Sequence, residues 1–298
     1  MKKVLITGAS GFIGSALFNK FENEKYNVVG WSKSVSNIFN NVDLLNYEKV
    51  RKELSKLKPD IIIHCAGSAN VSLSIKEPKT DFEANVLATQ NLLCAIYESE
   101  EYNPKFVFLS SAGIYGNPQK LPINEEASYN PLSPYALHKV MCEQMCLFYK
   151  KNYGLDLRIA RIFSAYGVGL RKQIFWDLYQ KYTNYGCLNV FGTGNESRDF
   201  IAIEDVVNAI YLIAISETDE CIFNVANGEE ITIREVVEVF AECVNIPQGF
   251  ISFNGIVRDG DPLNWKADIS KIKKLGYKKT IKISEGLCNY VKWVRENS

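Results

Sequence analysis

A tyrosine and a lysine set four residues apart in SPYALHK (133–139) are the residues of this chain best suited to proton transfer. Residues i and i+4 share one face of an α-helix, so a helix here brings the side chains of Tyr135 and Lys139 together. At about 4 Å and an effective dielectric constant of about 20, an ammonium stabilises a phenolate by up to about 4 kcal/mol. The pair could therefore exchange a proton with a substrate oxygen. The same spacing also occurs on ordinary solvated helix faces, so its meaning depends on the rest of the chain.

A glycine-rich turn, GASGFIG, follows the first apolar run of the chain and precedes a helical pattern. Glycines let the backbone turn tightly and approach a pyrophosphate, while the helix N-terminus offers free N–H groups. The spacing G-x-x-G-x-x-G at a first strand–helix junction predicts a dinucleotide site. The residues predicted to hold the diphosphate are Gly8, Ser10, Gly11, Phe12, Ile13 and Gly14.

The second predicted strand, 26–31, ends at the residues that would contact the adenine ribose. NAD-binding folds usually carry a carboxylate there for the ribose 2′-hydroxyl, but this chain has Ser32 and Lys33. A hydroxyl and a cation suit the 2′-phosphate of NADP. We therefore expect NADP(H) to be preferred, with NAD(H) as the alternative, and we place Asp43 and Leu44 at the adenine.

Strands alternate with helices through the first half of the chain. Beyond the segments above, strands are predicted at 60–67, 105–111 and 156–162, and helices at 80–98 and 135–152. This alternation predicts an α/β fold, a doubly wound parallel sheet with helices on both faces and ligands at the carboxyl ends of the strands. After about residue 165 the pattern loosens, with helices predicted at 172–186, 232–245 and 284–296 and a mixture of turn and strand at 190–206.

Composition excludes several classes of protein. The 298 residues carry 34 basic and 34 acidic side chains, which gives no electrostatic case for binding nucleic acid or an anionic membrane. No apolar run approaches the roughly 20 residues of a membrane span. Eight cysteines without a C-x-x-C pair, and only two histidines, leave no zinc spacing, so we expect no metal. Most of the cysteines have apolar neighbours, as reduced core cysteines do, which favours a cytoplasmic protein.

The motifs TGASGFIG, HCAG, LSSAGIYG and Y-x-x-x-K, in this order, resemble the extended short-chain dehydrogenase/reductase family over nearly the whole chain. That family includes nucleotide-sugar epimerases, dehydratases and ketoreductases. The resemblance implies that residues 1–165 form a dinucleotide-binding Rossmann domain, joined by a returning segment near 200–226. Residues 166–298 would form a smaller, mostly C-terminal α/β substrate domain.

The resemblance also assigns roles. Ser111 would hydrogen-bond the reacting sugar oxygen, Tyr135 would exchange a proton with that oxygen, and Lys139 would hold the nicotinamide ribose. Ala66 and Gly67, from HCAG, would border the cofactor. Asn85 would support the site, whereas His64 and His138 are expected to be structural.

For the substrate, a nucleoside-diphosphate sugar, the resemblance assigns the diphosphate to Arg198 and Arg258, with Arg171 as a weaker candidate. Ser164 stands where relatives commonly carry a substrate-contacting asparagine, which puts that contact in doubt.

Ala112 and Gly113 replace the acidic pair that 4,6-dehydratases use, so dehydration is not expected. The main prediction is a 4-keto-sugar-nucleotide reductase using NADPH. The alternative is a nucleotide-sugar 4-epimerase, like UDP-glucose 4-epimerase, that retains NAD. A non-catalytic dinucleotide sensor is the remote alternative, because sensors tend to lose the Ser, Tyr or Lys retained here. The family also implies a homodimer.

Overall fold

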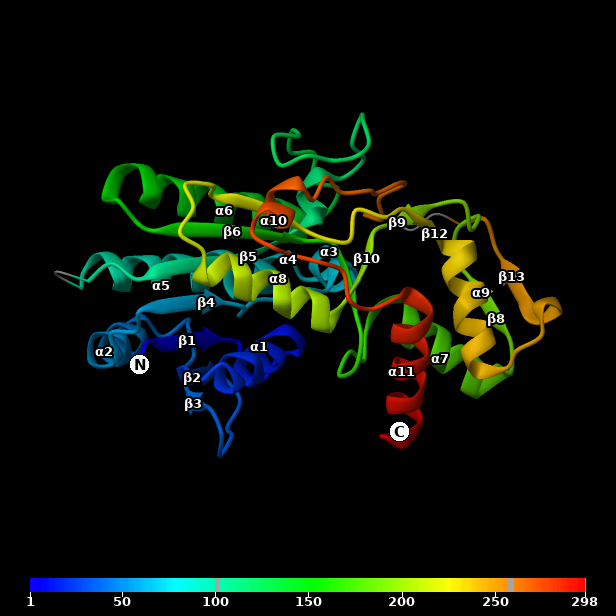
Figure 1. Cartoon of the computed structure of the whole chain (residues 1–298), viewed down its shortest axis with the longest axis horizontal. Helices are drawn as coiled ribbons and strands as arrows, with labels where there is room; N and C mark the ends of the chain where they lie inside the picture. The colour runs from blue at the N-terminus through cyan, green and yellow to red at the C-terminus, as the bar shows by residue number, and fades with distance from the viewer. Residues whose placement is uncertain (100–101, 257–259, 298) are drawn as a thin grey trace.

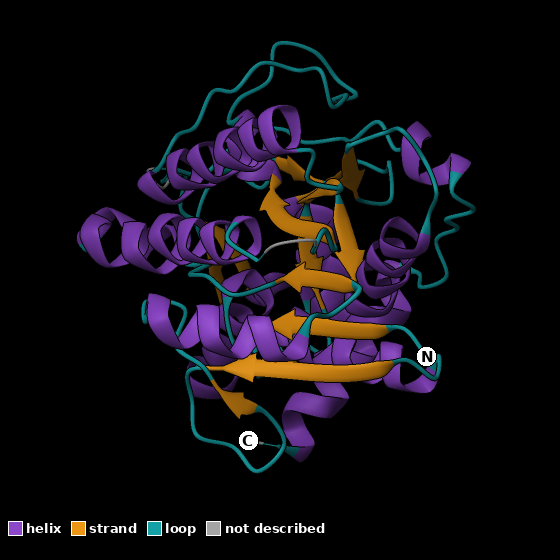
Figure 2. Cartoon of the chain, turned by 90° about the vertical axis from the view of Figure 1, so that its left-hand side faces the viewer, coloured by secondary structure: helices purple, strands orange, loops and turns teal. Residues whose placement is uncertain are grey.

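A seven-stranded parallel sheet forms the centre of the molecule (Figure 2). The computed structural model describes residues 1–99, 102–256 and 260–297. The strands of the sheet lie in the order β11-β6-β5-β4-β1-β2-β3. From β1 the chain first adds strands toward one edge and then, starting with β4, toward the other edge, so the strand order reverses between β1 and β4. The strands are β1 (Lys3–Thr7), β2 (Asn27–Ser32), β3 (Asn40–Asn41), β4 (Ile61–His64), β5 (Lys105–Ser111), β6 (Leu157–Ile162) and β11 (Ile222–Val225).

Helices cover both faces of this sheet, which explains why its central strands are continuously apolar rather than alternating (Figure 1). On one face, α1 (Phe12–Asn23), α8 (Ile203–Ile215) and α10 (Ser270–Lys274) pack over one core. On the other face, α2 (Tyr47–Leu57), α5 (Ala88–Tyr97) and α6 (Pro134–Tyr153) pack over a second core. The predicted doubly wound α/β fold is confirmed.

The segment predicted as one helix over 80–98 is a continuous helical run with a change of pitch. After the short α3 (Val71–Lys76), α4 (Pro78–Phe82) leads into a π-helical turn, η1 (Glu83–Leu87), and then into α5. Single π-turns within helices are frequent at functional sites, and this one contains Asn85.

Helix α6 has clear start and stop signals. Ser133 caps its N-terminus by accepting a hydrogen bond from the Ala136 N–H (3.2 Å), and Pro134 occupies the first turn. Gly154 ends it in the left-handed conformation, at φ +70°.

A third core lies beyond one end of the sheet, where α7 (Gln173–Tyr185), α9 (Ile233–Val244) and α11 (Ile283–Glu296) gather (Figure 1). Three short strand pairs accompany these helices: β7 (Ser164–Tyr166) with β10 (Phe200–Ala202), β9 (Ser197–Arg198) with β12 (Ile231–Thr232), and β8 (Leu188–Val190) with β13 (Ile251–Phe253). The described residues also contain two 3₁₀ turns, η2 (Ala112–Tyr115) and η3 (Gln248–Phe250). The division of the chain at residue 165 stays a prediction.

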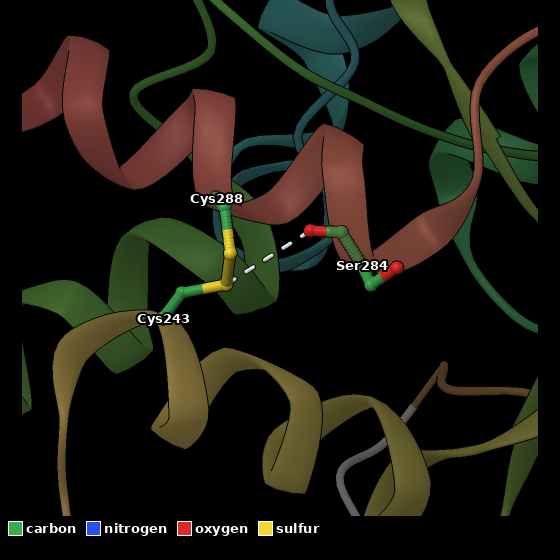
Figure 3. Close-up of a disulfide and its surroundings, with 3 residues drawn as sticks. All are labelled: Cys243, Ser284 and Cys288. Carbon is green, nitrogen blue, oxygen red and sulfur yellow. Dashed lines mark hydrogen bonds between the residues drawn. A yellow bond between two sulfur atoms is a disulfide. The ribbon is translucent and has the colours of Figure 1, made fainter.

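The cysteines depart in one respect from the reduced state predicted for most of them. Cys243, in the last turn of α9, and Cys288, in α11, form a disulfide with their Cα atoms 5.1 Å apart (Figure 3). The two residues are separated by 45 positions in sequence, so only the packing of α9 against α11 reveals the pair. The Ser284 carbonyl oxygen lies 3.9 Å from the Cys243 sulfur, a contact rather than a hydrogen bond because a disulfide sulfur carries no proton. The cysteines at 65, 94, 142, 146, 187 and 221 are free.

Within the described ranges, no helix combines the length and the apolar character needed to cross a membrane. The same residues contain no group of three or more metal-ligating side chains.

Candidate active site

The glycine-rich turn is pressed against the end of β4, at the point where the strand order reverses. A Cβ atom added to Gly8, whose φ is +67°, would lie 2.7 Å from the Ala66 nitrogen. One added to Gly14 would lie 2.2 Å from the Gly8 carbonyl oxygen. Gly11 is the N-cap of helix α1 and provides no side-chain cap, which leaves the first N–H groups of the helix open to an anion. This cradle, at a topological switch point, fits the diphosphate of a dinucleotide.

The end of β2 does not form the phosphate site predicted from Ser32 and Lys33. Ser32 is buried, and its Oγ lies 2.8 Å from the Ser10 Oγ while accepting a hydrogen bond from the Ser34 N–H (3.1 Å). Lys33 is exposed on the surface. The hydroxyl is therefore used to join the glycine-rich turn to β2, and the expected NADP preference gains no support from this geometry.

The residues predicted at the adenine lie just beyond β3. Leu44 is buried and its carbonyl oxygen accepts a hydrogen bond from the Asn91 side chain (2.8 Å). Asp43 is exposed, and its Oδ1 accepts from the Leu45 N–H (3.0 Å). The backbone here is thus fixed, with the Leu44 side chain in the core and the Asp43 carboxylate open to a ligand.

Ser111, Tyr135 and Lys139 meet at the carboxyl end of β5. Tyr135 and Lys139 are almost fully buried in the first two turns of α6, and the Lys139 Nζ donates to the Leu109 carbonyl oxygen (3.0 Å). The same Nζ lies 6.0 Å from the centre of the Tyr135 ring. Ser111 ends β5 and its Oγ accepts from the Gly113 N–H (3.1 Å).

The position of Gly113 shows how close these side chains are. A Cβ atom added to Gly113 would lie 3.3 Å from the Ser111 Oγ and 4.0 Å from the Tyr135 Cε1. A hydroxyl, a phenol and an ammonium therefore converge on one small volume, which is the arrangement needed to pass a proton to or from a substrate oxygen.

Asn85 completes the wall around Lys139. Gly67 has φ +149°, and a Cβ atom added there would lie 2.5 Å from the Asn85 Oδ1 and 3.7 Å from the Lys139 Nζ. The Asn85 Nδ2 donates to the Asp81 carbonyl oxygen (3.0 Å), and its buried Oδ1 has no hydrogen-bond partner in the described part of the chain. The structure thus brings Gly67, Asn85 and Lys139 together at the end of β4.

Both histidines are buried and bonded within the protein, consistent with structural roles. Burial, helped by the charge of Lys139, lowers the pKa of His64 to about 3. Its Nδ1 lies 2.7 Å from the Thr7 Oγ1 and its Nε2 lies 3.1 Å from the Thr89 Oγ1. The His138 Nδ1 lies 2.6 Å from the Asp81 Oδ2.

The predicted substrate residues divide into two groups. Arg198, in β9, donates from Nη1 to the carbonyl oxygens of Ser197 (2.8 Å) and Leu263 (3.2 Å), and burial lowers its pKa. Ser164 begins β7, and its N–H donates to the Asp199 carbonyl oxygen (3.1 Å).

Arg171 lies against different segments. Its guanidinium carbon is 5.6 Å from the Trp176 ring and 5.5 Å from the Trp293 ring, and its Nη2 donates to the Asn297 carbonyl oxygen. The structure therefore does not bring Arg171 together with Arg198. Arg258 lies outside the described residues.

A buried polar network beneath the site escaped the sequence analysis. Arg161 on β6 forms a fully buried ion pair with Glu143 on α6, with Nη2 and Oε2 2.7 Å apart. Its Nη1 also donates to the Tyr115 hydroxyl (2.9 Å) and to the Glu125 carbonyl oxygen (2.6 Å). Burial raises the pKa of the Glu125 carboxyl, which accepts from the Asn224 N–H (2.9 Å). These contacts fix the 112–129 loop, and their members are too far apart in sequence to give a local signal.

Three comparisons with known proteins agree with this geometry. The model of the NAD-dependent epimerase/dehydratase family matches residues 4–226. A putative UDP-glucose 4-epimerase of Methanocaldococcus jannaschii is 31% identical, and the match covers 99% of each chain. The solved UDP-glucose 4-epimerase of Thermotoga maritima with UDP-glucose superimposes with a TM-score of 0.90 at 25% identity, over 99% of each chain. The UDP-glucuronic acid 4-epimerase of Bacillus cereus, solved with UDP-glucuronic acid and NAD, has a TM-score of 0.90 at 26% identity, over 99% of this chain and 100% of that one.

Proposed function

The chain belongs to the NAD-dependent epimerase/dehydratase family, and within it we propose that this protein is a UDP-sugar 4-epimerase that retains NAD. At the coarser level it is a nucleotide-sugar enzyme of the NAD-dependent epimerase/dehydratase type. The proposal rests on one observation above all. Ser111, Tyr135 and Lys139 converge beside the glycine-rich turn, while Ala112 and Gly113 occupy the positions where a dehydratase needs acids.

Three residues have separate roles in the proposed reaction. Ser111 orients the C4 oxygen of the sugar, and Tyr135 accepts the proton from that oxygen as the C4 hydrogen leaves as hydride. Lys139 lies beside Tyr135 and stabilises the phenolate that accepts this proton. NAD, when held by the glycine-rich turn, would supply a reversible hydride acceptor that can serve either face of C4. Tyr135 then returns its proton, so the reaction consumes no net reductant.

The reductase that we first predicted has less support than its alternative. That prediction depended on an NADP preference, and the buried Ser32 hydroxyl is already bonded to Ser10 and Ser34. The B. cereus relative, in addition, was solved with NAD. We therefore propose NAD(H) as the cofactor.

The decisive experiment uses purified protein with UDP-glucose and, separately, UDP-glucuronate, followed by proton NMR. The proposal expects conversion to the C4 epimer without added cofactor and without a change in absorbance at 340 nm. Stoichiometric oxidation of NADPH by a 4-keto-6-deoxy sugar nucleotide would instead establish the reductase. Bound NAD with no turnover of any sugar nucleotide would favour a sensor.

We also propose a homodimer that forms through the outward faces of α5 and α6. Large apolar side chains are exposed there, with Tyr97 58% and Phe148 54% exposed. A hollow of about 510 Å³ lies between the two helices, lined by Gln90, Gln144, Met145, Phe148, Tyr149 and Tyr153. Exposed apolar patches of this kind mark interaction sites.

Light scattering tests the dimer. The wild type should give twice the mass of one chain and Phe148→Glu the mass of one chain; a monomeric wild type would refute the dimer.

A further inference from the structure

Trp265 links two parts of the molecule that the proposed reaction needs to work together. The indole is 92% buried, and its Nε1 donates to the Gly116 carbonyl oxygen (2.9 Å). Gly116 ends the 3₁₀ turn that starts directly after Ser111, and its φ of +54° is held by tight packing, because an added Cβ atom would lie 1.9 Å from the Asn130 carbonyl oxygen. One edge of the indole is thus bonded to the end of the turn that follows Ser111.

The ring of the same tryptophan supports Arg198. The guanidinium carbon of Arg198 lies 5.7 Å from the ring centre, a distance at which a cation is attracted to an aromatic face. The backbone adds to this contact, because the Trp265 N–H donates to the Ser197 carbonyl oxygen (3.2 Å). The segment that carries the ring is therefore paired with the strand that carries the arginine.

The contacts of Arg198 leave one edge of its guanidinium for a ligand. Both of its hydrogen bonds to carbonyl oxygens, those of Ser197 and Leu263, use Nη1. Across residues 1–99, 102–256 and 260–297, the Nε and Nη2 atoms of Arg198 form no hydrogen bond. A planar edge with two parallel donors matches two oxygens of a diphosphate.

Arg171 provides an internal contrast. It also lies over tryptophan rings, those of Trp176 and Trp293, but these belong to α7 and α11, and its hydrogen bond goes to the Asn297 carbonyl oxygen. Among the described residues, none of these contacts of Arg171 reaches the turn after Ser111. In that part of the chain two arginines, Arg171 and Arg198, lie over tryptophan rings, and of these two Arg198 is the one whose tryptophan is bonded to that turn.

We propose that Trp265 is a positioning residue that fixes the distance between the Arg198 guanidinium and the turn from Ser111 to Gly116. The diphosphate and the hexose of one UDP-sugar can then be bound at the same time. This inference rests on the proposed function. It adds that the affinity for the nucleotide depends on Trp265 through Arg198, and that the rate depends on Trp265 through Gly116.

A double-mutant cycle tests the first dependence, with UDP as the probe and calorimetry as the measurement. Trp265→Leu should weaken UDP binding about tenfold and leave NAD binding unchanged. In an Arg198→Ala background the same substitution should have little further effect, because the two residues act through one contact. Trp293→Leu, the matched control at the other arginine, should leave UDP binding within about twofold of wild type.

The second dependence is tested with Trp265→Phe, which retains an aromatic face and loses the N–H. This variant should keep KM within about threefold while kcat falls by about tenfold. Full additivity of Trp265→Leu and Arg198→Ala, an equal loss of NAD binding, or an equal effect of Trp293→Leu would overturn the inference. Because UDP binding needs no turnover, a protein that binds UDP with the expected coupling but epimerises nothing would refute the proposed function alone.

Discussion

The two halves of the candidate site are built in different ways. The half that would hold the cofactor and move the proton is made of short motifs at the ends of neighbouring parallel strands, with Gly8 after β1, Gly67 after β4 and Ser111 at the end of β5. The half that would hold the substrate diphosphate combines Arg198 with Trp265, from segments 67 residues apart, and Trp265 is in turn bonded to Gly116, in the turn after Ser111. The first half is determined mainly by backbone geometry and the second mainly by side-chain packing.

This difference predicts how each half responds to substitution. A change in the cofactor half should abolish a step or a binding mode outright, because few alternatives exist to a phenol or to a left-handed glycine. A change in the substrate half should weaken the affinity for the UDP-sugar only partly, because several contacts each contribute to binding. Matched pairs of variants separate these two responses.

The largest effect is expected for Tyr135→Phe. Removal of the hydroxyl leaves the sugar oxygen without a proton acceptor, so kcat should fall on the order of 10³-fold. Tyr149→Phe, on the same helix with its hydroxyl near Cys94, is the control and should keep full activity. UDP and NAD binding should be unchanged in both variants. Near-normal turnover by Tyr135→Phe would refute the assigned role.

The next effect is expected for Gly8→Ala. Its Cβ atom would lie 2.7 Å from the Ala66 nitrogen at a φ of +67°, so the glycine-rich turn must move and NAD affinity should fall about 100-fold. Gly154→Ala is the matched control, because it has a similar φ of +70° but no atom within 4 Å of the added Cβ. It should cost about 1 kcal/mol of stability and leave NAD binding intact. Fluorescence titration with NADH measures both variants, and equal losses would show that backbone strain, not the cradle, controls binding.

The sequence predicts the features of the cofactor half better than those of the substrate half. Helix α6 was predicted over 135–152 and spans Pro134–Tyr153, because its apolar periodicity and its caps are local signals. The glycine-rich turn and the Ser111, Tyr135 and Lys139 set could be predicted as a candidate site for the same reason. In contrast, α8 was not predicted, and its first turn fell within the tract 190–206 that was read as a mixture of turn and strand, because β10 runs directly into the helix at Ala202 and Ile203 with no loop between them.

The remaining features depend on contacts that no local pattern encodes. Ser32 looked free for a phosphate, but the fold turns its hydroxyl onto Ser10, 22 residues earlier. Arg171 was a weaker candidate for the diphosphate, and its side chain contacts Trp293 and Asn297, at the other end of the chain. Both side chains have partners that are supplied by distant sequence.

The substrate half is tested by comparing two arginines. Arg198→Ala should raise KM for the UDP-sugar about 30-fold, since hydrogen bonds to a charged group contribute about 1.5–3 kcal/mol each. Arg171→Ala should change KM by less than about threefold, because the structure places this side chain on α7 and α11. Steady-state kinetics at saturating NAD decide between them. A larger effect at Arg171 would mean that the diphosphate lies elsewhere.

The smallest effects are expected from pH, and they should have opposite signs in the two halves. Beneath the cofactor half, burial lowers the pKa of His64 to about 3, below its ordinary value. Its contribution to stability is therefore present above about pH 6.5 and is lost as the pH falls toward 3, by roughly 0.7 kcal/mol between pH 7 and pH 6. Beside Arg198, burial raises the pKa of Asp199 to about 7, although the backbone N–H groups of Ala267 and Asn227 oppose the rise.

The contribution of Asp199 to stability is therefore present below about pH 4 and is lost as the pH rises through about 7. Urea unfolding from pH 5 to pH 8 tests both effects, because they oppose each other below about pH 6.5 and each substitution should expose the other. His64→Gln should leave a stability that falls as the pH rises from 5 to 7. Asp199→Asn should leave a stability that rises over the same interval. If both variants kept the wild-type profile, neither group would titrate differently in the folded and unfolded chain, and the two halves would differ only in how they bind their ligands.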